Sequence, residues 1–195
     1  MFAKLPLIDY QPLKIIDIAQ VYCTLTHPHF SNQIITDIDQ EINIIANKSQ
    51  ITCQQSIPKH EEELKIIAVV KQLLTNLPKY SYPKLSLKFK RIISLPGKSD
   101  QAIAYFQTDL LTDSISTDLI GGKLNLTYNL NSCPLYFSLQ SALIRQQDHR
   151  LLPALAFEGE FAYGNKDPRE ILQIINNWSE DWLTFKEIIN QGFLG

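Results

Sequence analysis

The chain has 195 residues, 45% of them hydrophobic and 19% charged, and a formal net charge of −2. This length is typical of one domain, and the apolar fraction supplies a core and excludes an intrinsically disordered chain. Three widely spaced cysteines, Cys23, Cys53 and Cys133, give neither a closed disulfide framework nor paired metal-binding spacing. Cysteine usage of this kind is typical of a reducing cytoplasm.

A leader peptide and membrane segments are not expected. Residues 1–12 lack the apolar run of a signal peptide. The longest apolar blocks, such as residues 66–70, are far shorter than the ~20 residues that cross a bilayer. We therefore expect a soluble, cytoplasmic protein with no membrane contact.

The first 78 residues predict a mainly helical layer. Residues 12–25 fit a helix or a strand equally well, and residues 48–58 fit a loop or a short strand. Between them, Ser31 can cap a helix whose isoleucines fall on one stripe, at Ile34, Ile38, Ile42 and Ile45. A clearer helix begins near the three glutamates at 61–63, which favour the positive end of a helix dipole, and ends at Pro78.

Residues 79–164 predict the sheet. Leu85, Leu87 and Phe89 alternate with polar residues, which is typical of a half-buried strand. Similar runs follow at 123–130, 135–139 and 154–163, and residues 102–106 are a candidate for a further strand. Because the runs have polar faces, they favour antiparallel pairing over parallel pairing. We expect an antiparallel sheet of about four to five strands.

Residues 165–195 predict an amphipathic helix that packs on the sheet. Asp167, Pro168 and Glu170 fit the N-cap, N1 and N3 positions of a capping box. Apolar residues then recur every three or four positions, at Ile171, Ile175, Trp178, Trp182, Phe185 and Ile189. Gly192 fits the end of this helix, and Ser179 is a possible break within it. Together the three regions predict a single α+β domain.

The charge distribution is the feature that departs most from an average chain. Eight of the 18 basic residues lie in residues 64–99, which hold no acidic residue, so the rest of the chain carries 10 basic and 20 acidic residues. A segregated basic block is typical of a protein that contacts a polyanion. The candidate binding residues in it are Lys79, Tyr80, Tyr82, Lys84, Lys88, Lys90, Arg91 and Lys98.

Two further interpretations of these lysines stay open. Lysines on the open face of a strand often protect a sheet against aggregation. Glu158 and Glu160 share one face of the last predicted strand, and they could act as cross-strand charge partners of the lysines.

Metal and catalytic chemistry have weaker signals. Cys23, His27 and His29 are possible zinc ligands, but Pro28 separates the two histidines and no recognised spacing supplies a fourth ligand. Glu158 and Glu160, with Asp109, could hold Mg²⁺ in a nuclease, although no lysine accompanies the second acid as such sites usually require. No serine nucleophile elbow or phosphate-binding glycine loop is present, so we expect no catalytic residue, metal or cofactor.

The sequence therefore predicts a non-enzymatic accessory or adaptor subunit of a larger intracellular assembly. Its basic segment, residues 64–99, would contact RNA or another single-stranded nucleic acid in a ribonucleoprotein, for example a CRISPR-type effector, or an acidic protein partner. One alternative is a small-molecule-binding protein or enzyme with a pocket between sheet and helices. The other is the metal-dependent nuclease.

Overall fold

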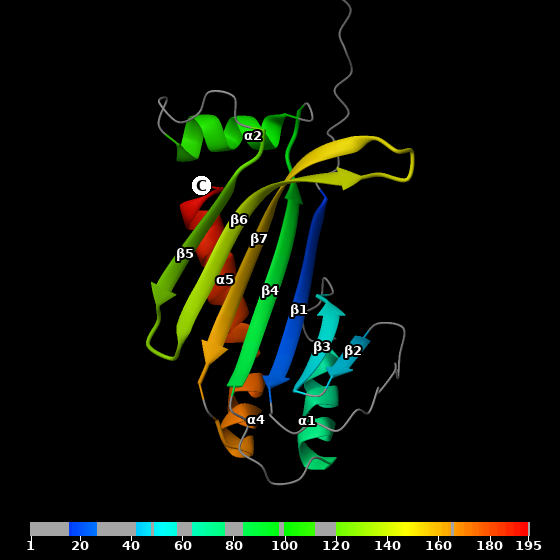
Figure 1. Ribbon diagram of the computed structural model, residues 1–195, viewed down its shortest axis with the longest axis vertical. Coiled ribbons are helices and arrows are strands. Elements are labelled where there is room, and N and C mark those ends of the chain that lie inside the picture. The colour runs from blue at the N-terminus through cyan, green and yellow to red at the C-terminus, as the bar shows by residue number, and fades with distance from the viewer. Residues whose placement is uncertain are drawn as a thin grey trace, which may run out of the picture.

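A computed structural model describes residues 16–26, 42–47, 49–57, 64–76, 84–97, 100–111, 120–164 and 166–194. One antiparallel sheet runs through this part of the chain, with the strand order β2-β3-β1-β4-β7-β6-β5 (Figure 1). The strands are β1 (Asp17–Thr26), β2 (Ile42–Asn47), β3 (Gln50–Ser56), β4 (Lys84–Ser94), β5 (Lys123–Asn129), β6 (Pro134–Arg145) and β7 (Leu151–Tyr163). The fold is thus a mixture of helices and an antiparallel sheet, as the alternation predicts.

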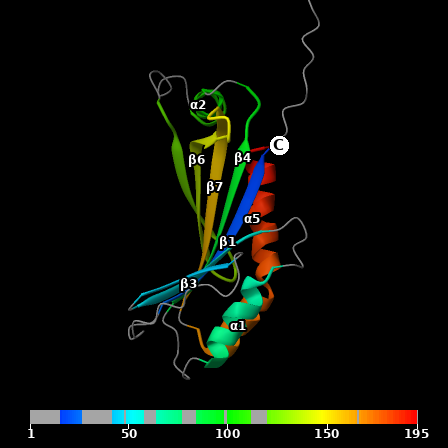
Figure 2. The same ribbon diagram turned by 90° about the vertical axis from the view of Figure 1, so that its right-hand side faces the viewer.

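The described helices are α1 (Ile66–Asn76), α2 (Gln101–Tyr105), α4 (Pro168–Asn176) and α5 (Trp178–Gly192), and a π-helical segment, η2 (Phe106–Leu110), continues α2. Three of these helices, α1, α4 and α5, lie on one side of the sheet (Figures 1 and 2). The short α2 lies across one end of the sheet. The opposite face of the central strands points away from the three helices.

Packing between α5 and the central strands forms the middle of the core. Phe89 of β4, Phe161 of β7 and Phe185 of α5 are completely buried. The Phe89 ring lies 5.7 Å from the Phe161 ring and 6.0 Å from the Phe185 ring, centroid to centroid, which are favourable distances for aromatic pairs. Gly159 lies directly under Phe185, where a β-carbon would come within 2.6 Å of the ring. Helix α5 can therefore lie close to β7 only because residue 159 is glycine.

The C-terminal capping box is confirmed. The Asp167 carboxylate accepts hydrogen bonds from the backbone N–H groups of Arg169 and Glu170, and the Glu170 carboxylate accepts one from the Asp167 N–H at 2.9 Å. The apolar stripe that follows is buried as predicted. The helix breaks at Asn177, two residues before Ser179, where the backbone leaves helical geometry (φ −96°, ψ 15°).

The prediction of about four to five strands is wrong, because the sheet has seven. The described part of residues 1–78 contributes three of them and one helix, so a mainly helical layer is also wrong there. The sequence places Ile42 on a helical stripe with Ile38, but positions four apart share one face in a strand as well as in a helix. Ile42 is buried in β2 and Ile45 is 60% exposed, as strand alternation requires. The residues from 31 to 41 lie outside the described part.

Residues 102–106 are helical rather than extended. They belong to α2 and to the start of η2, and Ala102 and Phe106, four residues apart, are both buried. A five-residue apolar run is too short for periodicity to distinguish a helix from a strand.

A buried acid ties β7 to α5. The Tyr163 hydroxyl donates a hydrogen bond of 2.6 Å to the Asp181 carboxylate, and both residues are buried. Burial raises the pKa of Asp181 to about 6, although the hydrogen bond from Tyr163 partly opposes this shift. Since an unfolded aspartate titrates near 3.8, the folded protein binds a proton here more tightly than the unfolded chain does.

We expect Gly159→Ala to lower the melting temperature by roughly 3–10 °C, because a new methyl group must displace Phe185 and such overpacking costs ~1–3 kcal/mol. Thermal unfolding followed by circular dichroism measures this. Gly164→Ala is the matched control, since no atom lies within 4 Å of its added β-carbon. Equal melting temperatures for the two variants would contradict the close approach of α5 to β7.

The stabilising protonation of Asp181 should be present below about pH 4 and lost as the pH rises through about 6. The melting temperature should therefore rise by a few degrees between about pH 7.5 and about pH 5. Asp181→Asn, which cannot titrate, should remove most of this rise. An unchanged pH profile in the variant would show that another group is responsible.

Candidate functional site

The face of the central strands that points away from α1, α4 and α5 is called the open face here. Because alternate side chains of a strand point to opposite sides, it carries Tyr22, Thr24, Lys88, Glu160 and their alternate neighbours along β1, β4, β7 and β6. Most of these side chains are exposed or partly exposed, although the small residues Ser86, Ala154 and Ala156 on this face are buried. The intervening residues supply the core. The open face therefore presents a polar surface along the central strands.

Strand register aligns the open-face residues into rows that cross the sheet. One row contains Tyr22, Lys88, Glu160 and Tyr136, and each residue is the direct cross-strand partner of the next. The neighbouring row contains Gln20, Lys90, Glu158 and Ser138. Each row thus places a lysine of β4 beside a glutamate of β7.

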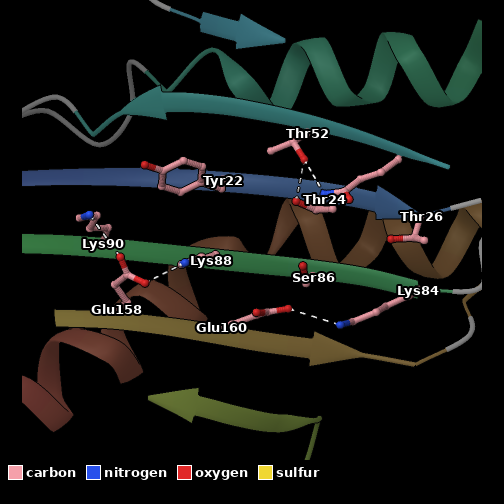
Figure 3. A pocket seen from close by; sticks show the side chains of 11 residues that line it. Tyr22, Thr24, Thr26, Thr52, Lys84, Ser86, Lys88, Lys90, Glu158 and Glu160 are labelled. Carbon is pink, nitrogen blue, oxygen red and sulfur yellow. Dashed lines mark hydrogen bonds and ion pairs between the residues drawn. The ribbon is translucent and has the colours of Figure 1, made fainter. Parts of the chain in front are cut away.

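These lysines and glutamates form ion pairs, as the cross-strand interpretation predicted. Lys88 Nζ lies 2.8 Å from Glu158 Oε2, and Lys90 Nζ lies 3.2 Å from Glu158 Oε1. Lys84 Nζ lies 3.5 Å from Glu160 Oε1 and is the most exposed of the three lysines, with 52% of its side chain accessible. Figure 3 shows the five side chains on the adjacent strands β4 and β7. Three ammonium groups face two carboxylates, so the cluster carries a net charge of +1.

The pKa of Glu158 reflects its position between two lysines. Burial alone raises the pKa, but the hydrogen bonds and positive charges of Lys88 and Lys90 outweigh it and hold the pKa below its usual range. The carboxylate is therefore ionised at neutral pH. It does not act as a proton donor there.

Hydroxyl groups extend the open face on the β1–β3 side. Thr24 and Thr52 share a hydrogen bond of 3.1 Å, and Thr26, Ser86 and Gln50 lie beside them (Figure 3). Together with the lysine–glutamate cluster they line a groove of about 400 Å³. A second hollow of about 310 Å³ adjoins it on the β5–β6 side, and the two share Lys88, Glu158 and Glu160.

The structure divides the basic residues that the sequence singled out. Lys84, Lys88 and Lys90 come together on the open face. Arg91 points to the opposite face, where its guanidinium lies 2.7 Å from the Asp17 carboxylate. The other four candidates, Lys79, Tyr80, Tyr82 and Lys98, lie outside the described residues.

Sequence reasoning missed the aromatic and hydroxyl residues of this surface. Tyr22 and Tyr136 lie in one row with Lys88 and Glu160, and Tyr136 is 51% exposed. The alternation of residues around each tyrosine, which assigns it to one face of its strand, was visible in the sequence. Their common row depends on the order of β1, β4, β7 and β6, which alternation does not specify.

The proposed metal ligands are not brought together in the part of the chain that the structure describes, where no cluster of three ligating side chains occurs. Cys23 is buried opposite Cys53 in adjacent strands. Burial raises the pKa of both thiols, that of Cys53 to about 12, which disfavours the thiolate that a metal requires. His27 and His29 lie outside the described residues.

The acids of the nuclease alternative are also separated. Glu158 and Glu160 lie in the second half of β7, whereas Asp109 belongs to η2. This segment continues α2, which lies across the end of the sheet opposite to the end of β7 (Figure 1). Both glutamates are within 3.5 Å of lysines rather than facing a shared metal position.

No described helix is long and apolar enough to cross a membrane. In comparisons with models of protein families, curated proteins and solved structures, nothing matches this chain. The role of the open face must therefore be inferred from its geometry and charge.

We expect Glu158→Gln to lower the melting temperature by a few degrees at low salt, because it removes one carboxylate that balances two lysines; partly exposed pairs of this kind contribute ~0.2–1 kcal/mol. The difference from the parent chain should shrink in high salt, which screens charge, and it should also shrink as the pH falls through the lowered pKa of Glu158. Glu187→Gln, at an exposed position of α5, is the control. A difference that salt does not change would contradict an electrostatic role.

Proposed function

We propose that this chain is a non-enzymatic adaptor that docks a protein partner on the open face of its sheet. The observation that carries this proposal is the pairing of lysines with glutamates across β4 and β7. This pairing produces a broad surface that carries both positive and negative groups. Surfaces of this kind favour partners with complementary charges, and they contribute to specificity more than to affinity.

The lysine cluster suits a protein better than a nucleic acid. A phosphate backbone presents only negative charge, whereas Glu158 and Glu160 place two carboxylates among the three lysines. Each phosphate that approached Lys88 or Lys90 would also approach Glu158. A protein surface can supply both a carboxylate and an amine or amide, so it can satisfy both members of each pair.

Packing also argues against a ligand pocket between sheet and helices. The central strands and α5 meet through the rings of Phe89, Phe137, Phe161 and Phe185, all at most 1% exposed. Aromatic contacts of 5.7–6.0 Å fill the space where the alternative would place a ligand. Two grooves that are large enough for another molecule lie instead on the open face.

A display library of random peptides, selected against the full chain, tests the proposal. We expect enriched peptides whose affinity falls at least about tenfold in Ser138→Arg, which places a bulky cation in the row of Lys90 and Glu158. Ser179→Arg, the same change on the exposed side of α5, should leave binding unchanged. Fluorescence anisotropy of the synthesised peptides gives both affinities.

Two outcomes would overturn the proposal. In one, selection yields no peptide, or the peptides bind both variants equally. In the other, a labelled single-stranded RNA binds with an affinity that falls steeply with salt, and the triple change of Lys84, Lys88 and Lys90 to glutamate abolishes that binding. The second result would establish a nucleic-acid surface instead.

A further inference from the structure

The hairpin of β6 and β7 continues beyond the rest of the sheet. The last pair between β7 and β4 is Ala154 with Ser94, and the hairpin extends past it to Arg145 and Leu151. This part, residues 143–153, is called the arm. Figure 1 shows the arm bending across the ends of β4 and β1 at the top of the molecule. Its bend leaves a hollow between the arm and the start of β1.

Part of the lining of the hollow is apolar. Ile16 and Ile18 line one side and Ile144 of the arm lines the other, around a volume of about 560 Å³. Ile18 is 43% exposed, which is unusual for an isoleucine in a strand next to the centre of a sheet. The neighbouring open-face position on β4 is Ile92. The open face therefore changes from charged rows in its middle to aliphatic side chains at this end.

The rim of the hollow carries positive charge. Arg145 and Arg150 belong to it, together with Asp148. Asp148 already has a charge partner, because its carboxylate lies 2.6 Å from the Arg150 guanidinium and also accepts a hydrogen bond from the Arg150 backbone N–H. Arg145 is exposed and makes no ion pair with any residue that the structure describes. The rim thus offers one guanidinium to an incoming anion.

The turn that holds the rim is well defined. Gln146 and Arg150 are joined by a backbone hydrogen bond of 2.9 Å, and the His149 N–H donates one of 3.0 Å to the Gln146 carbonyl. These bonds close the turn and fix the strand end from which Arg145 projects. The backbone position of Arg145 beside the hollow is therefore defined, and its planar guanidinium can pair with a carboxylate through two parallel hydrogen bonds.

We propose that this hollow anchors a protein segment in which an aliphatic side chain is flanked by a carboxylate. The aliphatic group would contact Ile16, Ile18 and Ile144, and the carboxylate would pair with Arg145. This inference rests on the proposed function and specifies the partner. The charged rows in the middle of the open face then accept the rest of the segment, and the arm determines where it starts.

Two synthetic peptides test the anchor. One places isoleucine between glutamates in a glycine–serine background, and its counterpart has lysines in place of the glutamates. We expect the glutamate peptide to bind the full chain more tightly. Arg145→Glu should weaken that binding at least about tenfold and should reverse the preference in favour of the lysine peptide. Lys123→Glu, which makes the same charge change on exposed β5, is the matched control and should have little effect.

The apolar half of the hollow has its own variant. Ile18→Ser should weaken the glutamate peptide about tenfold or more, because it removes the aliphatic contact. Ile45→Ser is the control, since Ile45 is also an exposed strand isoleucine, at 60%, but lies on β2 at the sheet edge. Both isoleucines are exposed, so the two variants should fold. Equal loss in both, or no binding of the glutamate peptide to the parent chain, would overturn the anchor.

Other results separate the anchor from the proposed function. Display peptides that respond to Ser138→Arg but not to Arg145→Glu or Ile18→Ser would leave the docking surface in place and overturn the anchor. A concentration-dependent dimer in sedimentation velocity that Ile18→Ser dissolves would identify a second copy of this chain as the occupant. That result would also overturn the anchor as stated.

Discussion

The packing of α5 against β4, β6 and β7 is the contact on which the rest of the structure depends. Phe185 lies over Gly159 and against Phe89 and Phe137, and burial of these rings supplies much of the apolar driving force. Because α5, α4 and α1 all lie on this side (Figure 2), the core is one-sided. The other face of the central strands is then free to carry polar side chains.

That polar face could not hold unbalanced charge without a cost in stability. Lys88 and Lys90 are only partly exposed, and adjacent like charges on a sheet repel each other. Glu158 lies directly opposite Lys90 in the strand register and reduces this repulsion. The lowered pKa of Glu158 reflects this attraction between its carboxylate and the two lysines. The same pairing that stabilises the sheet also turns a basic strand into a surface with both signs of charge.

The surface is graded along the strands. Hydroxyl groups on β1 and β3 lie at one end together with Lys84, the ion pairs of Glu158 lie in the middle, and isoleucines and Arg145 lie at the other end beside the arm. A gradient of this kind gives an extended partner a direction, because each part of the segment meets a different chemistry. The bent arm adds a wall at the apolar end, so the proposed docking surface is more than a flat sheet.

The sequence by itself determined the local structure of most of residues 84–94 and 123–192, but not that of residues 42–47 and 102–106. Alternation specified β4 to β7, and the Asp167–Glu170 capping box specified the start of α4, because both depend on neighbours within a few residues. Alternation also assigned the pairing glutamates and lysines to one face of their strands. Tertiary structure decided the strand order, the three additional strands and the hollow beneath the arm. Lys84 and Glu160 are 76 residues apart in sequence, and residues so distant meet only through the pairing of whole strands, which local periodicity does not encode.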